Sequence, residues 1–176
     1  MPLYPATDDE LESTAALVNL AYRGTEGWTH EGDFMAGLRT DTKTLRRDLA
    51  ANPDARLLTF KDNTDSPLLG VVWLEPAEAG VWYLGMLTVR PDIQDRQLGR
   101  LILALAETLA ADQGARRIRM TVLNVREPLI AWYQRRGYCK TTETQPFPYD
   151  DQRFGVPKRA DLAFVVMEKS IAEGRL

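Results

Sequence analysis

The chain contains 176 residues, of which 44% are hydrophobic and 27% are charged, a composition typical of soluble globular proteins. This length supports one substantial core, so we expect a single domain over residues 1–176. The net charge of −3 argues against a nucleic-acid-binding protein, and a single cysteine and a single histidine argue against a disulfide framework and a His/Cys zinc site. We therefore predict no bound metal. Because no long apolar run and no signal-peptide pattern is present, we expect a cytoplasmic protein.

The N-terminal half predicts helices followed by a β-hairpin. An amphipathic helix is expected at 8–22, where Thr7 and Glu10 have capping-box spacing and apolar side chains recur along one face. A dense turn signal at 62–67 separates two β-rich runs, which predicts a hairpin. The other expected segments are, in chain order, a short strand at 3–6, a weak helix at 34–38, a helix capped by Asp41 or Thr42 that ends before 52–53, strands at 56–61 and 68–74, and a turn at 75–80.

The central stretch at 81–114 predicts a strand, a turn and a long helix. Residues 81–89 are mostly apolar without alternation, as in a strand covered on both faces, and Pro91 ends that strand because it has no N–H to donate. Apolar side chains then recur at helical spacing over 98–109. Because Arg90, Arg96 and Arg100 surround the free N–H groups at the helix start, we expect an anion such as a phosphate to bind there.

The C-terminal half predicts strands around one further helix. Residues 117–123 alternate between apolar and polar side chains, which is typical of a strand with two different faces. A helix with Pro128 in its first turn ends at Gly137. Further strands are expected at 138–143 and 160–169, with a loop at 146–159 between them. Together these elements predict a mixed α/β sheet.

Two segments resemble landmarks of the GNAT superfamily of N-acetyltransferases. The first, at 89–100, is similar to the family's acetyl-CoA signature Gln/Arg-x-x-Gly-x-Gly/Ala: Gln94 and Gly99 match, and Gln97 stands where the first glycine is usual. The second, at 129–138, is similar to the family's late helix, with Tyr133 four residues before a Gly-aromatic pair. The resemblance implies a single-domain α/β (α+β) GNAT fold, with a mixed, mostly antiparallel central sheet flanked by helices.

The resemblance also implies acetyl-CoA as cosubstrate. Its pyrophosphate would bind backbone amides at the helix start, and its pantetheine arm would pair with the strand main chain. Leu87, in a bulge after Gly85, would donate its amide to the oxyanion, and Tyr133 would act as general acid for the departing thiolate. Asn124 either contacts the cofactor or caps the following helix. The implied cofactor-binding residues are Leu87, Thr88, Val89, Gln94, Asp95, Arg96, Gln97, Leu98, Gly99, Arg100, Asn124 and Tyr133.

The general base and the acceptor site are defined less sharply. Residues 81–89 contain no carboxylate, and the topology that the family resemblance implies makes Glu31, Asp33 and Glu75 the candidate bases, with Glu31 taken first. A free amine can also react without a base. Two loops, 24–33 and 145–159, are expected to contact the acceptor. Their residues Trp28, Glu31 and Tyr149 suit a cationic amine, while Arg153, Lys158 and Arg159 leave an acidic acceptor open.

The predicted reaction is acetyl transfer to a primary amine, on a small molecule or a peptide, by direct attack in a ternary complex. Cys139 is a poor nucleophile, because no histidine lies near it in the sequence. Two alternatives stay open: a catalytically inactive acyl-CoA-binding module and, more weakly, a nucleotide-binding protein that lacks Gly-x-Gly-x-x-Gly. We expect no nucleic-acid or membrane partner, and a homodimer through the last strand and the proline-rich loop stays open.

Overall fold

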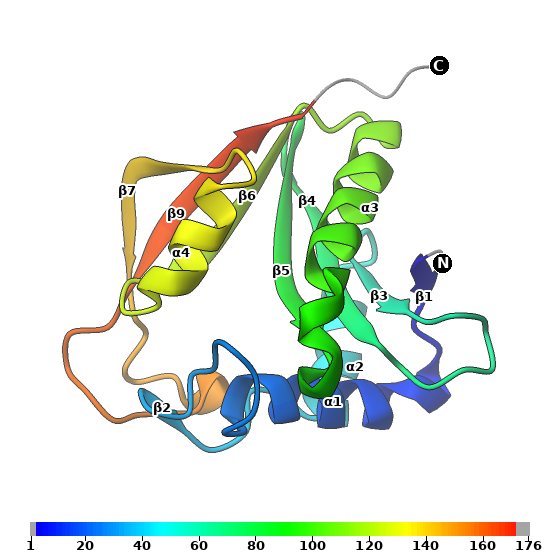
Figure 1. Cartoon of the computed structure of the whole chain (residues 1–176). Coiled ribbons are helices and arrows are strands. Elements are labelled where there is room, and N and C mark those ends of the chain that lie inside the picture. The colour runs from blue at the N-terminus through cyan, green and yellow to red at the C-terminus, as the bar shows by residue number, and fades with distance from the viewer. Residues whose placement is uncertain (1–2, 172–176) are drawn as a thin grey trace.

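The computed structural model describes residues 3–171, apart from the side chains of residues 94–96 and 154. A seven-stranded sheet in the order β1-β3-β4-β5-β6-β9-β7 runs through the molecule, and of its neighbouring pairs only β5 and β6 are parallel (Figure 1). Its strands are β1 (Leu3–Pro5), β3 (Arg56–Phe60), β4 (Gly70–Glu78), β5 (Val81–Val89), β6 (Arg117–Leu123), β7 (Cys139–Pro146) and β9 (Ala163–Ser170). The α-helices of the described part are α1 (Leu11–Arg23), α2 (Thr42–Ala51), α3 (Leu98–Asp112) and α4 (Glu127–Gln134).

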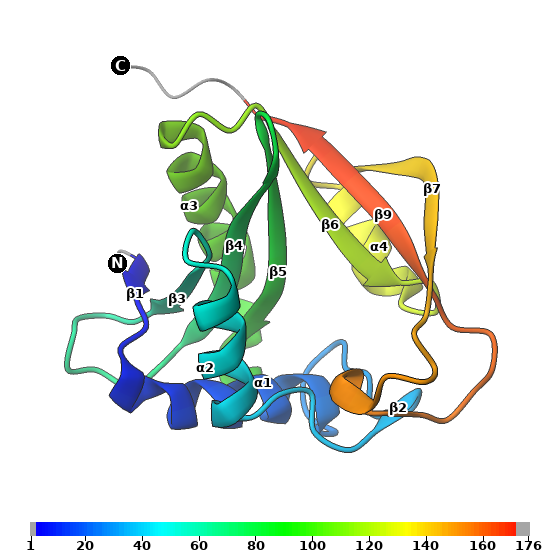
Figure 2. The ribbon, with the colours of Figure 1, turned by 180° about the vertical axis from the view of Figure 1, so that it is seen from behind.

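The central strands bury side chains on both faces of the sheet, because successive residues of a strand point to opposite sides. On one face, Val72 and Leu84 belong to a core with Ile102 of α3 and Ile130 of α4. On the other face, Val71 and Trp73 pack with α1 and α2. Figure 2 shows α2 over β4 on this second face, with α1 crossing below the sheet. This two-sided burial explains the uninterrupted apolar runs of β4 and β5.

Strands β5 and β6 pair at one end only. Their register runs from Val81 opposite Arg117 to Tyr83 opposite Arg119, and in the described residues it goes no further. Figure 1 shows the two strands diverging from this end, with α3 beside β5 and α4 beside β6 and β9. The second half of β5 therefore has no strand neighbour on its β6 side.

The same half of β5 carries a β-bulge. Val71 pairs with Thr88 and Trp73 with Gly85, so Met86 and Leu87 together oppose the single residue Val72. Met86 adopts a φ of 53°, and the Thr88 hydroxyl donates a hydrogen bond to its carbonyl oxygen at 2.9 Å. The bulge that the sequence predicts after Gly85 is confirmed.

The weak helix predicted at 34–38 is wrong, because this segment forms a short strand. Strand β2 (Met35–Ala36) pairs antiparallel with β8 (Val156–Pro157), and the Lys158 amide donates to the Phe34 carbonyl oxygen at 2.8 Å. Periodicity along the chain reports local structure only, so it does not reveal a partner so distant in the sequence. The segment predicted as a loop at 146–159 supplies that partner strand and a 3₁₀ turn, η3 (Gln152–Phe154).

The predicted fold class is confirmed: the sheet is mixed, mostly antiparallel and flanked by helices. Several strand ends differ from the prediction: β4 begins at Gly70 rather than at 68, β9 begins at Ala163 rather than at 160, and β4 and β7 extend further than predicted. β4 continues to Glu78 because it remains paired with β5, so the predicted turn at 75–80 is shorter, and β7 continues to Pro146 along β9. Within the described residues, no helix combines the length and the apolar sequence needed to cross a membrane.

Candidate active site

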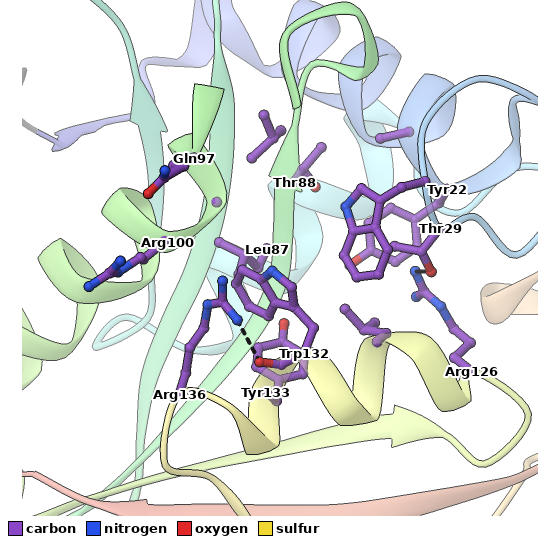
Figure 3. Close-up of a pocket in the computed structure, with 15 residues that line it drawn as sticks. Tyr22, Thr29, Leu87, Thr88, Gln97, Arg100, Arg126, Trp132, Tyr133 and Arg136 are labelled. Atoms are coloured by element: carbon purple, nitrogen blue, oxygen red, sulfur yellow. Dashed lines mark hydrogen bonds between the residues drawn. The ribbon is translucent and has the colours of Figure 1, made fainter. Parts of the chain in front are cut away.

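A first cavity of about 260 Å³ lies between the second half of β5, the start of α3 and the helix α4 (Figure 3). The end of α1 and the loop that carries Trp28 and Thr29 complete its lining. Figure 3 shows Trp132 and Tyr133 directed from α4 toward β5. The cavity brings together these predicted site residues: Leu87, Thr88, Val89, Gln97, Gly99, Arg100 and Tyr133.

The start of α3 presents unpaired backbone amides to this cavity. The first hydrogen bond across the helix start joins the Leu101 amide to the Gln97 carbonyl oxygen at 3.2 Å, so the amides of Leu98, Gly99 and Arg100 have no partner within the helix. Gln97 adopts the left-handed conformation, with φ 59° and ψ 16°. The backbone thus keeps the shape that glycine favours, although the residue is glutamine.

Basic side chains border the cavity beside α4. The Arg136 guanidinium lies 3.5 Å from the centroid of the Trp132 ring, and its Nη1 donates to the Trp132 carbonyl oxygen at 2.7 Å. Burial, together with the nearby charges of Arg135 and Arg100, lowers the pKa of Arg136. These three arginines also line an adjacent hollow of about 500 Å³, together with Lys169 and Glu107, which form an ion pair at 2.7 Å. Mutual repulsion among the three arginines favours a bound anion.

Tyr133 is buried on α4 with 6% of its surface exposed. Its ring packs edge-on against Trp132 and Tyr138, at centroid distances of 5.0 and 5.6 Å. No described residue hydrogen-bonds to its hydroxyl. Burial is the main cause that raises the pKa of Tyr133, so the phenol keeps its proton at neutral pH. The cavity wall therefore contains a hydrogen-bond donor without a protein acceptor.

A second cavity of about 400 Å³ lies where β5 and β6 separate. Residues from β5, β6, α1 and the two loops joined by β2 and β8 line it. It shares five residues with the first cavity, and we call them the shared wall: Tyr22, Leu87, Arg126, Leu129 and Tyr133. The two cavities thus meet beside the β5 bulge and the Tyr133 ring.

Glu31, the first candidate base, is buried between two arginines. Its Oε2 accepts a short hydrogen bond from Arg23, and its Oε1 accepts one from Arg126 Nη1 at 2.9 Å. All three side chains are at most 9% exposed. Arg126 also donates to the Thr29 hydroxyl at 3.2 Å, while its buried Nε has no partner among the described residues. Glu31 therefore ties α1, the following loop and α4 together and offers no unoccupied carboxylate oxygen.

The other candidate bases lie outside both cavities. Asp33 is exposed, and Glu75 accepts a hydrogen bond from Asn52 at 2.7 Å. Among the described side chains, no three His, Cys, Asp or Glu groups are arranged to hold a metal ion.

Several predicted site residues lie elsewhere. Trp28 lines the first cavity, 6.4 Å from the Trp132 ring, and does not line the second. Tyr149 packs on Phe147, accepts a hydrogen bond from the Leu162 amide at 2.8 Å, and lines neither cavity. Asn124 likewise lines neither, because its side-chain amide binds the backbone of Asp161 and Ala163.

The remaining predicted contacts fall on the turn before α3. Gln94, Asp95 and Arg96 belong to the 3₁₀ turn η2 (Pro91–Arg96), and their side chains lie outside the described residues.

The site residues that sequence reasoning missed include Tyr22, Arg126 and Arg136. Tyr22 was expected on the apolar face of a helix, yet its ring lies 5.6 Å from the Arg39 guanidinium and 5.4 Å from that of Arg126. Arg126 had a usable signal, because it stands at the N-cap of α4, where a cation opposes the helix dipole. Because a cation is unfavourable at that position, its presence indicates an anionic partner, and in the structure this partner is Glu31.

The chain also resembles known acetyltransferases in sequence and in fold. The profile described as the acetyltransferase (GNAT) family matches residues 17–138, more than half of the chain. A ribosomal-protein-alanine N-acetyltransferase from Brucella melitensis is 16% identical, with 97% of this chain and 100% of that chain covered and a TM-score of 0.69. A mutant spermidine N-acetyltransferase from Vibrio cholerae is 12% identical, with 97% and 95% covered and a TM-score of 0.67.

A shorter alignment relates the chain to a nourseothricin acetyltransferase. It has 23% identity, covers 68% of this chain and 67% of that chain, and has a TM-score of 0.56. A search of curated proteins found no match. At these identities the solved structures establish a common fold.

Proposed function

This chain belongs to the GNAT family of acetyltransferases, and from that membership we propose that it transfers an acetyl group from acetyl-CoA to a primary amine. The observation that carries the proposal is the shared wall, at which one cavity suited to a thioester meets a second cavity suited to an acceptor. The proposal treats residues 1–176 as one acetyltransferase domain.

The residues of the first cavity fit a coenzyme A ester. The unpaired amides of Leu98, Gly99 and Arg100 suit a pyrophosphate, and the side chains of Arg100 and Arg136 suit phosphate oxygens. The main chain at Leu87 and Thr88 lacks a β6 neighbour, so its polar groups on that side are available to the amides of a pantetheine arm. Acetyl-CoA supplies the activated acetyl group, and the Leu87 amide is the proposed donor to its carbonyl oxygen.

Direct attack accounts for the chemistry without an acetyl-enzyme. The amine nitrogen forms a bond to the acetyl carbon, the carbon–sulfur bond breaks, and the sulfur leaves as a thiolate. We assign Tyr133 as the group that donates to this thiolate. Because the pKa of Tyr133 is raised, the phenol acts mainly by donating a hydrogen bond while the amine proton passes to sulfur or solvent.

We assign no dedicated general base. Both oxygens of Glu31 are engaged by guanidinium groups, and we propose that this residue positions Arg126. Arg39, Arg119 and Arg126 line the second cavity, and a positive surrounding favours the neutral form of a bound amine. A small neutral fraction of the acceptor is then sufficient for attack.

The proposal is tested by ligand protection and by turnover. Acetyl-CoA should raise the melting temperature, whereas NAD and ATP should not. Release of free thiol should require an amine, screened over amino acids, polyamines, aminoglycosides and peptide N-termini. Protection without turnover on any amine would favour the alternative, a catalytically inactive acyl-CoA-binding module. Absence of protection by acetyl-CoA would contradict both.

A further inference from the structure

The charges around the second cavity are unequal. Three guanidinium groups line it, from Arg39, Arg119 and Arg126, together with a single carboxylate, that of Glu31. That carboxylate accepts hydrogen bonds from Arg23 and Arg126 through its two oxygens. No lining carboxylate of the described part is therefore left to bind an ammonium group of the acceptor.

Arg119 retains donor capacity after its own ion pairs are counted. Its Nε donates to Glu168 at 2.7 Å and its Nη2 lies 3.4 Å from Glu78, whose side chain is 58% exposed. Glu168 also binds Arg117 at 3.1 Å, so one carboxylate is shared by two arginines. The side chain of Arg119 remains 27% exposed, which leaves it accessible to a ligand.

Positive charge also borders the shared wall. The guanidinium groups of Arg39 and Arg126 lie 5.6 and 5.4 Å from the centroid of the Tyr22 ring. Both groups therefore lie next to the proposed reaction centre. A polycationic acceptor would be repelled here, whereas an anionic group would be held.

The rest of the lining is apolar. Met35, Met86, Phe147 and Phe164 contribute hydrocarbon and aromatic surface, and Met35 and Phe147 are almost fully buried. Such a surface suits an aliphatic or aromatic side chain of the ligand. The cavity therefore combines an apolar surface with guanidinium groups.

We propose that the acceptor is a primary amine of the amino-acid class, in which a carboxylate is held by Arg39 and Arg119 and an apolar side chain fills the remaining space. This inference rests on the proposed acetyltransferase function and adds the class of its substrate. It resolves the two acceptor classes that the sequence leaves open in favour of the acidic one.

The test compares acceptors that differ only in the carboxylate. Leucine, leucinamide and 3-methylbutylamine form one matched set, phenylalanine, phenylalaninamide and phenethylamine form another, and spermidine represents the polycations. For each acceptor, kcat/KM is measured at saturating acetyl-CoA by thiol release. The ratio of kcat/KM for the acid to that for the amide is then compared between proteins, because this comparison cancels the different amine pKa values of the two acceptors.

The informative variants are Arg39→Gln and Arg119→Gln, with Arg39→Lys to retain the charge. Each Gln variant should lower the acid-to-amide ratio by about tenfold or more, because it removes a charge-assisted hydrogen bond. Arg39→Lys should restore part of the ratio. Arg47→Gln is the matched control, since Arg47 is 52% exposed and pairs with the adjacent Asp48. Melting temperature and acetyl-CoA affinity, measured on every variant, separate a binding defect from a folding defect.

Three results would overturn the inference. One is a higher kcat/KM for spermidine than for the acids, and another is an unchanged acid-to-amide ratio in both Gln variants. In either case the acetyltransferase proposal survives, because an amine is still acetylated. The third is acetyl-CoA binding with no turnover on any amine, which removes the acetyltransferase proposal and the substrate class with it.

Discussion

Tyr133 presents a hydroxyl that the described protein leaves without a hydrogen-bond partner, beside the β5 bulge. We predict that Tyr133→Phe lowers kcat by a factor on the order of 10²–10³, the usual effect of removing one hydrogen-bond donor to developing negative charge. Acetyl-CoA affinity should stay near that of the wild type, because the ring and its packing are retained. Steady-state kinetics and calorimetric binding measure the two quantities.

Tyr4→Phe serves as the control, since Tyr4 lies on the edge strand β1. The wild-type rate should also hold as pH rises toward 10, because the raised pKa of Tyr133 keeps its proton in place above the ordinary value of 10.0. An unchanged kcat in Tyr133→Phe would remove this residue from the mechanism.

Gln97 occupies a backbone conformation that costs a non-glycine residue about 1–2 kcal/mol. We predict that Gln97→Gly strengthens acetyl-CoA binding, because glycine lets a phosphate approach the α3 amides more closely. Stability should be equal or slightly higher, since strain relief opposes the greater entropy of glycine in the unfolded chain. Calorimetry and urea unfolding test the two effects.

The same substitution at a right-handed helical position provides the contrast. Gln134→Gly, at the exposed end of α4, should destabilise the protein by about 0.5–1 kcal/mol. Weaker acetyl-CoA binding in Gln97→Gly would show that the glutamine side chain itself contributes to the site.

At the scale of elements, Glu31 joins the end of α1 to the start of α4 through Arg23 and Arg126. Glu31→Ala leaves two buried guanidinium groups without their carboxylate, and we predict a loss of about 3–5 kcal/mol in the free energy of unfolding. The exposed pair of Asp8 and Arg46 is the comparison, and Asp8→Asn should leave the urea midpoint unchanged. A second variant, Glu31→Gln, should keep the pH dependence of kcat/KM, whereas a general base would lose it.

A second prediction at this scale concerns the pairing of β6 with β9. Burial opposes ionisation of Glu168, but hydrogen bonds from Arg119 and Arg117 outweigh it, so the pKa of Glu168 lies below its ordinary value of 4.5. A lowered folded-state pKa stabilises the protein above pH 4.5 and loses that contribution as pH falls below it. Wild type should therefore exceed Glu168→Gln in stability at pH 7, with the difference shrinking below pH 4.5 in urea titrations. A difference that stays constant with pH would contradict this.

Helices and strands could be predicted where the sequence pattern that indicates them lies within one continuous segment. Strands β5 and β6 have the predicted ends, because one is continuously apolar and the other alternates. Strand β2 pairs with β8, and Arg126 pairs with Glu31. Both pairings join segments that are distant in the chain, so no local sequence pattern predicts them. By contrast, the helix that carries Tyr133 and the start of α3 could be located from the sequence, because each is marked by a contiguous motif.

At the scale of the whole molecule, the separation of β5 from β6 creates the site. The sequence pattern predicts both strands, and only the family resemblance implies that they separate; the separation itself depends on the register between them and on the bulge opposite β4. The positive charge of the second cavity could not be predicted from the sequence either, because Arg39, Arg119 and Arg126 come from three segments that are distant in the chain. Each of the two predicted acceptor loops contributes a residue to the second cavity, Glu31 from one and Phe147 from the other, whereas Tyr149 lines neither cavity.

Two cavities that meet at one wall predict the kinetic order of the reaction. Because donor and acceptor have separate spaces joined at Leu87 and Tyr133, both substrates should be bound before transfer. Double-reciprocal plots at several fixed amine concentrations should intersect, and mass spectrometry should detect no acetylated protein after incubation with acetyl-CoA alone. Cys139→Ser should retain full activity, since Cys139 is exposed on β7 and lines neither cavity. Parallel plots with a burst of free thiol in the absence of amine would instead establish a covalent intermediate.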